Sequence, residues 1–276
     1  MHAHWERTFG QMRRAFFFDC RFCWIPLLLL LSVGFADVPQ SQAADFRIIT
    51  KLYAADNKDP LGENTTIFHG GNVYDFPATG DQITFFEKAE NQFVVLNAAK
   101  KTWTRISTDQ LLQYTAWLKE KSLESDDPLL RFCASPKFKI RSENSGKKWF
   151  FEHPLLEYQI EADTFDDPQI GLEYRSFSDW YARLNTMLRP QSLPPFPRLI
   201  VNQQMVQESL LPKAVQLRIS PSRHIGKKEL TVRSVHQVQV GLSAQDRERL
   251  AWVEECRQKF PEVSLVAYRN QWPEGK

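Results

Sequence analysis

Residues 64–107, NTTIFHGGNVYDFPATGDQITFFEKAENQFVVLNAAKKTWTRIS, decide the fold. Within them, short runs of β-branched and aromatic residues alternate with turn residues such as His69-Gly70-Gly71-Asn72 and Pro77-Ala78-Thr79-Gly80. This spacing is typical of an antiparallel meander, in which each strand is joined to the next by a tight turn. We therefore expect five strands here, at residues 65–68, 73–76, 82–87, 92–96 and 102–106.

The segments on either side of the meander show the same alternation of apolar and polar residues. Phe138 and Ile140, for example, alternate with Lys137, Lys139 and Arg141, the pattern of a strand with one buried face. These segments predict a total of eleven strands and then a short final strand. The further strands are expected at residues 46–54, 137–143, 147–152, 155–162, 214–219 and 229–240, and the final one at residues 263–268.

Helices are expected between the two groups of strands and near the C-terminus. Ser107 and Gln110 form a capping-box pattern, which marks the start of a helix. Asp127-Pro128 and Asp167-Pro168 each combine an N-cap residue with proline at the first helical position. The expected helices cover residues 108–123, a short segment after 128, residues 172–188, residues 199–208 and a segment after Ser243.

The N-terminus has the features of a secretory signal peptide. Arg13 and Arg14 precede the apolar run WIPLLLLLSVGFA at residues 24–36. This run is shorter than the roughly 20 residues of a typical transmembrane helix. We therefore expect a signal peptide at residues 1–36 and a single α+β domain at residues 37–276, located in the periplasm or cell envelope. The alternative is a retained membrane anchor.

Removal of the signal peptide makes the chain electrically neutral. Residues 1–36 contain four of the 35 Lys and Arg residues and two of the 33 Asp and Glu residues, which leaves 31 of each kind. Nucleic-acid binding depends on a basic surface, and attraction to anionic membranes needs clustered positive charge. The composition therefore argues against both partners.

Two cysteines, Cys133 and Cys256, lie beyond the predicted signal peptide. In an oxidising compartment they can form a disulfide, which would close a long loop. The alternative is a pair of unconnected thiols in the core. No Cys-x-x-Cys motif follows the signal peptide, so we expect no zinc or redox site.

No motif in the sequence indicates catalysis or a cofactor. His69-Gly70-Gly71 is similar to an esterase oxyanion loop, but Gly-x-Ser-x-Gly is absent, so a hairpin turn is the better interpretation. The histidines beyond the signal peptide are widely spaced and include no His-Glu-x-x-His motif. We expect no metal, no cofactor and no enzymatic activity.

Several segments resemble a family of uncharacterised exported proteins of planctomycete-type bacteria. The segments are TTIFHGGNVYDF, FFEKAENQFVVLN, STDQLLQYTAWL, FSDWYARLN and LPPFPR. No activity attaches to that family. The expected order of elements is also similar to the periplasmic lipoprotein-carrier class, which implies an antiparallel sheet of about eleven strands, curled into a half-barrel, with helices covering its concave face. No functional residue carries over from this likeness, and no helix is expected before the first strand.

The leading hypothesis is a non-enzymatic protein that binds or shields an apolar ligand, such as an acyl chain or a lipidated partner. An aromatic-rich curled sheet with apolar helices is suited to enclosing such a cavity. The residues expected to line it are Phe85, Phe93, Trp117, Trp180, Tyr181 and Phe196. One alternative is a structural or partner-binding envelope protein with a filled core. Another is a hydrolase that combines His69 or His236 with a nearby carboxylate.

Overall fold

The computed structural model describes residues 45–55, 57–164, 167–189, 191–222, 226 and 228–271. All of its helices and strands belong to one unit, Ser41–Lys276. The predicted signal peptide lies outside the described residues, and so does the predicted start of the domain at residue 37. The N-terminal boundary of the domain therefore stays a prediction.

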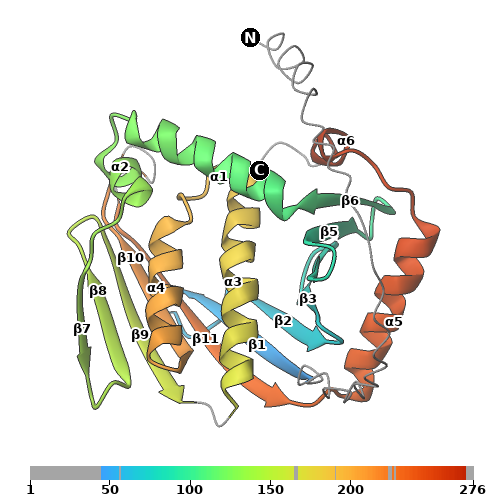
Figure 1. The fold of residues 1–276 in the computed structure, drawn as a ribbon, viewed down its shortest axis with the longest axis horizontal. Helices are drawn as coiled ribbons and strands as arrows, with labels where there is room; N and C mark the ends of the chain where they lie inside the picture. Colours follow the sequence, from blue (N-terminus) through green and yellow to red (C-terminus); the bar gives the residue numbers. More distant parts are fainter. Residues whose placement is uncertain are drawn as a thin grey trace, which may run out of the picture. The chain divides into compact units, whose positions relative to one another are not determined.

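The described part of the chain forms one antiparallel sheet of eleven strands (Figure 1). Their order is β6-β5-β4-β3-β2-β1-β11-β10-β9-β8-β7, so β6 and β7 are edge strands and the sheet is not closed into a barrel. The fold class is therefore α+β, as the sequence predicted. The strands are β1 (Phe46–Ala54), β2 (Gly62–His69), β3 (Asn72–Pro77), β4 (Gln82–Glu87), β5 (Gln92–Asn97), β6 (Thr102–Ser107), β7 (Lys139–Glu143), β8 (Lys148–Glu152), β9 (Leu156–Thr164), β10 (Leu210–Ile219) and β11 (Leu230–Val240).

The predicted meander is confirmed as strands β2 to β6. Its first turn shows why the sequence folds this way. His69 pairs with Asn72 across a two-residue loop, and Gly70 and Gly71 have φ angles of 57° and 79°. A type I′ hairpin turn needs positive φ at both central residues, and glycine adopts it without steric cost.

Strand β11 joins the two halves of the sheet. It pairs with β1 over nine residues, from Ala54–Val232 to Phe46–Val240, and with β10 on its other side. All other neighbouring strands are consecutive in the chain. The first and last of the described strands, β1 and β11, therefore meet in the middle of the sheet.

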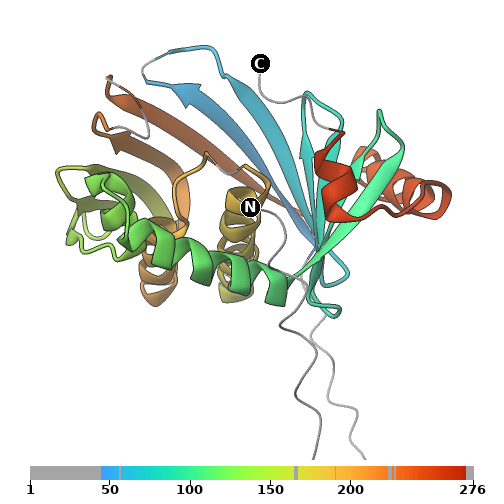
Figure 2. The same cartoon turned by 90° about the horizontal axis from the view of Figure 1, so that it is seen from above.

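Six helices accompany the sheet in the described residues. Figure 2 shows the sheet curving around α3 and α4, while α5 lies outside the curve beside the meander. The helices are α1 (Thr108–Leu123), α2 (Pro128–Ala134), α3 (Pro168–Leu188), α4 (Phe196–Gln207), α5 (Ala244–Lys259) and α6 (Leu265–Arg269). The predicted capping box is present at α1, where the Gln110 side chain accepts from the Ser107 N–H at 2.8 Å.

Apolar clusters cover both faces of the meander. Phe86 and Phe93 face inward and pack with Phe177 of α3. Phe85 faces outward and packs with Val253 of α5. Successive side chains of a strand point to opposite faces, so the runs of consecutive apolar residues in β4 and β5 reflect a sheet covered on both sides.

The final strand expected at residues 263–268 is wrong. The segment forms α6, and the Ser264 hydroxyl caps it by accepting the Ala267 N–H at 3.2 Å. Pairing with the edge strand is limited to the residues just before the helix, where the Val263 N–H donates to the Trp103 carbonyl at 2.8 Å. The N-cap serine thus outweighs the strand propensity of Val-Ala-Tyr. Helix α6 buries Tyr268 completely.

The structure contradicts the disulfide. Cys133 and Cys256 are both free and buried. Cys133 of α2 belongs to an apolar cluster with β8, β9 and α4, whereas Cys256 of α5 lies in the cluster on the outer face of the meander. The two thiols therefore lie in separate parts of the core, which agrees with the alternative of two unconnected thiols.

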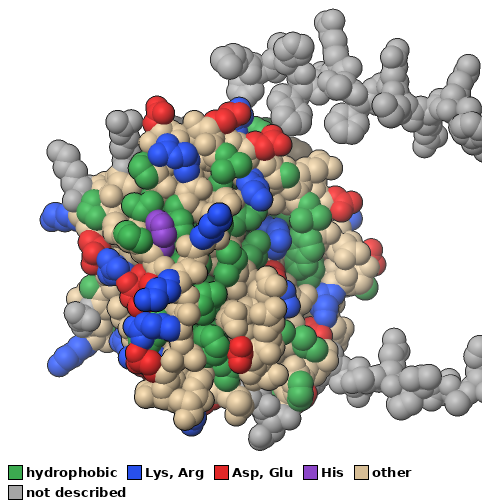
Figure 3. All heavy atoms as spheres, turned by 60° about the vertical axis from the view of Figure 1, so that its left-hand side comes forward, with side chains coloured by type: hydrophobic (Ala, Val, Ile, Leu, Met, Phe, Trp, Pro, Cys, Tyr) green, Lys and Arg blue, Asp and Glu red, His purple; other side chains and the backbone are tan. Residues whose placement is uncertain are grey.

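Charged side chains of both signs are interspersed on the face shown in Figure 3. Hydrophobic side chains lie between them rather than forming one continuous surface. Among the described residues, no helix is long and apolar enough to cross a membrane.

Candidate functional site

A cleft of about 820 Å³ lies between the concave face of the sheet and helix α3. Strands β1, β2, β3, β9, β10 and β11 contribute to its floor, and α3 with the segment that connects it to α4 forms its wall. Its volume is within the range of roughly 300–1,000 Å³ that is usual for ligand pockets. The cleft is therefore the leading candidate for a functional site.

The cleft begins where the core ends, along the same inward face of each strand. On β1, Phe46 and Ile48 are buried in the core cluster, and Ile48 also borders the cleft, which Thr50 and Leu52 then line. The partner strand β11 changes in the same way from core to cleft: Val238 packs against the core, and Leu230 lines the cleft. The helices thus cover only one end of these strands.

Folding leaves apolar side chains uncovered at the open end. Leu52 and Leu230 are each 40% exposed although they lie on the concave face. Leu217 and Ile219 of β10 also line the cleft, where Leu217 is half-buried and Ile219 is buried. The cleft therefore presents an apolar surface that nothing in the described part of the chain covers.

Helix α3 contributes a stripe of side chains at helical spacing to the cleft. Asp167 caps the helix by accepting the Gln169 N–H at 2.8 Å, and Pro168 occupies the first turn. Tyr174, Phe177, Tyr181 and Asn185 then follow at intervals of three or four residues and line the cleft. The stripe is apolar where it meets the core and polar towards the end of the helix.

A buried carboxyl group ties α3 to the sheet. Asp75 of β3 accepts hydrogen bonds from Asn64 and Thr66 of β2, both at 2.6 Å, and from the Tyr181 hydroxyl at 3.1 Å. Burial raises the pKa of Asp75 above its usual value, although the three donors act in the opposite direction. The Asp75 carboxylate in turn raises the pKa of Tyr181, so the tyrosine stays a hydrogen-bond donor.

His236 lies in the floor of the cleft between two hydroxyl groups. Its Nδ1 is 3.0 Å from Thr50 Oγ1, and its Nε2 is 3.0 Å from Ser234 Oγ. Burial, with a further contribution from the charge of Arg198, lowers the pKa of His236 to about 3. The imidazole is therefore neutral at physiological pH and serves as a polar group within the floor.

Two arginines border the cleft at the start and the end of the α3–α4 connection. Arg198, in the first turn of α4, has its Nη2 atom 3.4 Å from the Tyr174 hydroxyl. Arg189, which follows the last residue of α3, is exposed at the edge of the cleft. Among the described residues, neither guanidinium forms an ion pair with a carboxylate.

The predicted lining residues are distributed over several environments, and of the six only Tyr181 lines the cleft. Phe93 and Trp180 pack in the core cluster beside it, on Phe177 and Phe86. Trp180 of α3 and Phe93 of β5 therefore hold the helix on the sheet and do not form the wall of the cleft.

The other three predicted residues lie outside the cleft. Phe85 is on the opposite face of the sheet, under α5, because its side chain alternates with that of Phe86. Trp117 of α1 is 47% exposed. Phe196 begins α4, with the Lys119 ammonium 5.6 Å from the centre of its ring.

Apart from Tyr181 and His236, the polar residues of the cleft were not identified from the sequence, and only Asp75 among them has a local sequence signal. An aspartate in the middle of the apolar strand VYDF, at Asp75, is unusual enough to indicate a specific partner. Arg198 in the LPPFPR segment carries no such signal, because arginine is common at helix ends. Its position depends on how α4 packs on the sheet.

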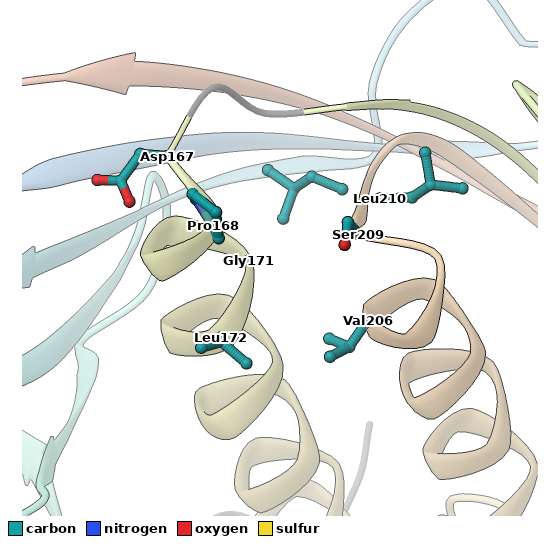
Figure 4. Close-up of a pocket in the computed structure, with 8 residues that line it drawn as sticks. Asp167, Pro168, Gly171, Leu172, Val206, Ser209 and Leu210 are labelled. Carbon is teal, nitrogen blue, oxygen red and sulfur yellow. The ribbon is translucent and has the colours of Figure 1, made fainter.

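A smaller pocket lies between the start of α3 and the end of α4 (Figure 4). Its volume is about 130 Å³, and Leu172 and Val206 point towards each other across it. Leu172 is 50% exposed there. This pocket is too small for anything but a short apolar group.

In the part of the chain that the structure describes, no three or more His, Cys, Asp or Glu side chains are arranged to hold a metal ion.

Comparison with protein-family models and with curated proteins finds no match to the chain.

Proposed function

We propose that this protein is a non-enzymatic component of the cell envelope that binds or shields an apolar or amphipathic ligand in the cleft beside α3. An acyl chain, free or attached to a lipidated partner, is the ligand class we propose. The exported location rests on the predicted signal peptide.

One observation carries this proposal. Leu52 and Leu230 line a cleft of about 820 Å³ and remain 40% exposed. Exposed apolar surface in a concave site costs free energy in water, and a ligand that covers it recovers this free energy. The cleft favours this proposal over a structural protein with a filled core.

An acyl ligand gives a graded prediction. Each buried CH₂ group contributes about 0.8 kcal/mol, which is roughly a fourfold change in Kd. Affinity for saturated fatty acids should therefore rise by about this factor per added CH₂ until the chain fills the cleft. Displacement of a fluorescent fatty acid measures each Kd on the purified protein.

A matched pair of substitutions locates the binding site. Ala182 of α3 lines the cleft, and Ala116 of α1 is an exposed alanine outside it. Ala182→Trp should fill part of the cleft and weaken binding of the longest chains about tenfold or more. Ala116→Trp makes the same chemical change and should leave affinity unchanged.

Two results would refute the proposal. One is an affinity that does not depend on chain length. The other is equal binding by the Ala182→Trp and Ala116→Trp proteins when both have wild-type thermal stability.

A further inference from the structure

We propose that the cleft selects amphiphiles with an anionic head group, and that Arg198 is the residue that recognises the head. This inference rests on the proposed function, because it concerns the head group of the ligand whose chain covers the apolar floor. The head would be a carboxylate or a phosphate.

The first argument is the position of Arg198 relative to the apolar surface. Arg198 lines the same cleft as Leu217, Ile219 and Leu230, and its Nη2 atom is 3.4 Å from the Tyr174 hydroxyl. In this arrangement the guanidinium can bind the anionic head of an amphiphile while the neighbouring apolar surface binds its chain. Arginine is suited to this role because its planar group can donate two parallel hydrogen bonds to a carboxylate or phosphate.

The second argument is that Arg198 has no carboxylate partner in the part of the chain that the structure describes. Four of the five arginines on the described strands, Arg47, Arg105, Arg141 and Arg218, do have such a partner. Arg47 contacts Asp246 at 2.8 Å, and Arg218 contacts Glu157 at 2.5 Å. Arg198 is partly buried, so its guanidinium, without an ion pair among the described residues, can accept an anion from outside.

The charges around Arg198 do not offset it at close range. The two carboxyl groups of the cleft are Glu63 and Asp75. Glu63 lies 3.6 Å from Lys51, and Asp75 is enclosed by its three donors. Arg189 at the edge of the cleft adds a second positive charge, so an anion that enters meets two guanidinium groups that form no ion pair within the described residues.

The charge of Arg198 also acts on the floor of the cleft. It lowers the pKa of His236 on β11 and counteracts the effect of burial on the pKa of Tyr158 on β9. The positive potential therefore extends over the surface that the ligand covers. This potential favours the anionic form of a bound head group.

The test compares ligands that share one acyl chain and differ in the head group. The probes are dodecanoate, dodecanoyl lysophosphatidate and the neutral monododecanoyl glycerol, each competing with a fluorescent fatty acid for the full-length protein. Inorganic phosphate is included as a head without a chain. We expect the two anionic amphiphiles to bind about tenfold more tightly than the neutral one, and inorganic phosphate to compete only weakly.

Three variants assign the preference to Arg198. Arg198→Gln should reduce the anionic preference to less than about twofold while affinity for the neutral amphiphile changes little. Arg198→Lys should retain part of the preference. Arg247 is exposed on α5, and Arg247→Gln removes the same charge without touching the cleft, so it should behave as wild type.

Salt provides a readout that needs no variant. Affinity for the anionic amphiphiles should fall as salt rises, whereas affinity for the neutral one should not, because ions screen the attraction between charges. Equal binding of all three amphiphiles by the wild type, or a full anionic preference in Arg198→Gln, would overturn the head-group inference and leave the proposed function intact. If no amphiphile binds, or if inorganic phosphate competes as well as lysophosphatidate, both proposals are refuted.

Discussion

The buried carboxyl group of Asp75 gives the sharpest test of the cleft's architecture. It accepts hydrogen bonds from Asn64, Thr66 and Tyr181, and through Tyr181 it fixes α3 against the sheet. Replacing it by alanine removes the common acceptor of three donors. Replacing it by asparagine keeps an acceptor oxygen of the same shape and removes the charge.

The expected magnitudes follow from the burial of the three donors. A buried donor that loses its partner costs about 1–3 kcal/mol. All three donors line the cleft, but Thr66 is buried and bears most of this cost, whereas Asn64 and Tyr181 are only partly buried and are more accessible to water. We therefore expect Asp75→Ala to lower the free energy of unfolding by about 2–4 kcal/mol. Asp75→Asn should stay within about 1 kcal/mol of wild type at neutral pH.

The pH dependence has a definite sign. Burial raises the pKa of Asp75 in the folded protein above its unfolded value, so the folded state binds a proton at a pH where the unfolded state has released it. The contribution of Asp75 to stability is therefore complete below the unfolded pKa and is lost as the pH rises through the folded pKa. Relative to Asp75→Asn, wild type should gain stability on acidification, by at most about 1.36 kcal/mol per pH unit.

Urea unfolding of wild type and Asp75→Asn at matched pH values measures this difference, and the other carboxylates cancel because both proteins contain them. Two results would show the reasoning to be mistaken. One is a wild type that loses stability relative to Asp75→Asn as the pH falls, which would mean that the folded protein favours the carboxylate. The other is an Asp75→Ala protein as stable as wild type.

Two further predictions concern the core. Phe93→Ala should lower the free energy of unfolding by about 3–5 kcal/mol, because Phe93 is fully buried between Phe86 and Phe177. The control, Trp117→Ala, should change the free energy of unfolding by less than about 1 kcal/mol. Equal losses of stability for the two variants in urea unfolding would contradict these positions. Burial raises the pKa of the Cys133 thiol to about 12. An alkylating reagent at mildly alkaline pH should therefore leave Cys133 unmodified until the protein unfolds, and mass spectrometry maps the modified residues. Rapid labelling of Cys133 in the native protein would refute its burial.

The sheet was largely predictable because its signals are local. Strand alternation, the Gly70-Gly71 turn and the Ser107 cap each act within a few residues. The failure at residues 263–268 has the same origin, since Ser264 provides an N-cap beside a segment of high strand propensity. The packing of α5 on the outer face is not local, because it depends on matching its apolar residues to outward-facing side chains of β2 to β6.

The candidate site was mostly beyond reach of the sequence. Aromatic residues were expected to line a cavity, but Phe85, Phe93 and Trp180 pack in or against the core, as large apolar side chains usually do. The cleft instead depends on where α3 and α4 stop covering the strands. Arg198 and Leu52 come from distant segments, and only the folded sheet places them in one cleft.

Native mass spectrometry of the full-length protein, expressed with its own N-terminus and followed by lipid extraction, tests most directly whether the cleft holds an amphiphile. We predict one bound amphiphile per chain in wild type and in Ala116→Trp, and its loss in Ala182→Trp. A bare protein mass for wild type, unchanged after addition of fatty acids or lysophospholipids, would contradict the proposed function. So would an equal ligand load in the Ala182→Trp and Ala116→Trp proteins.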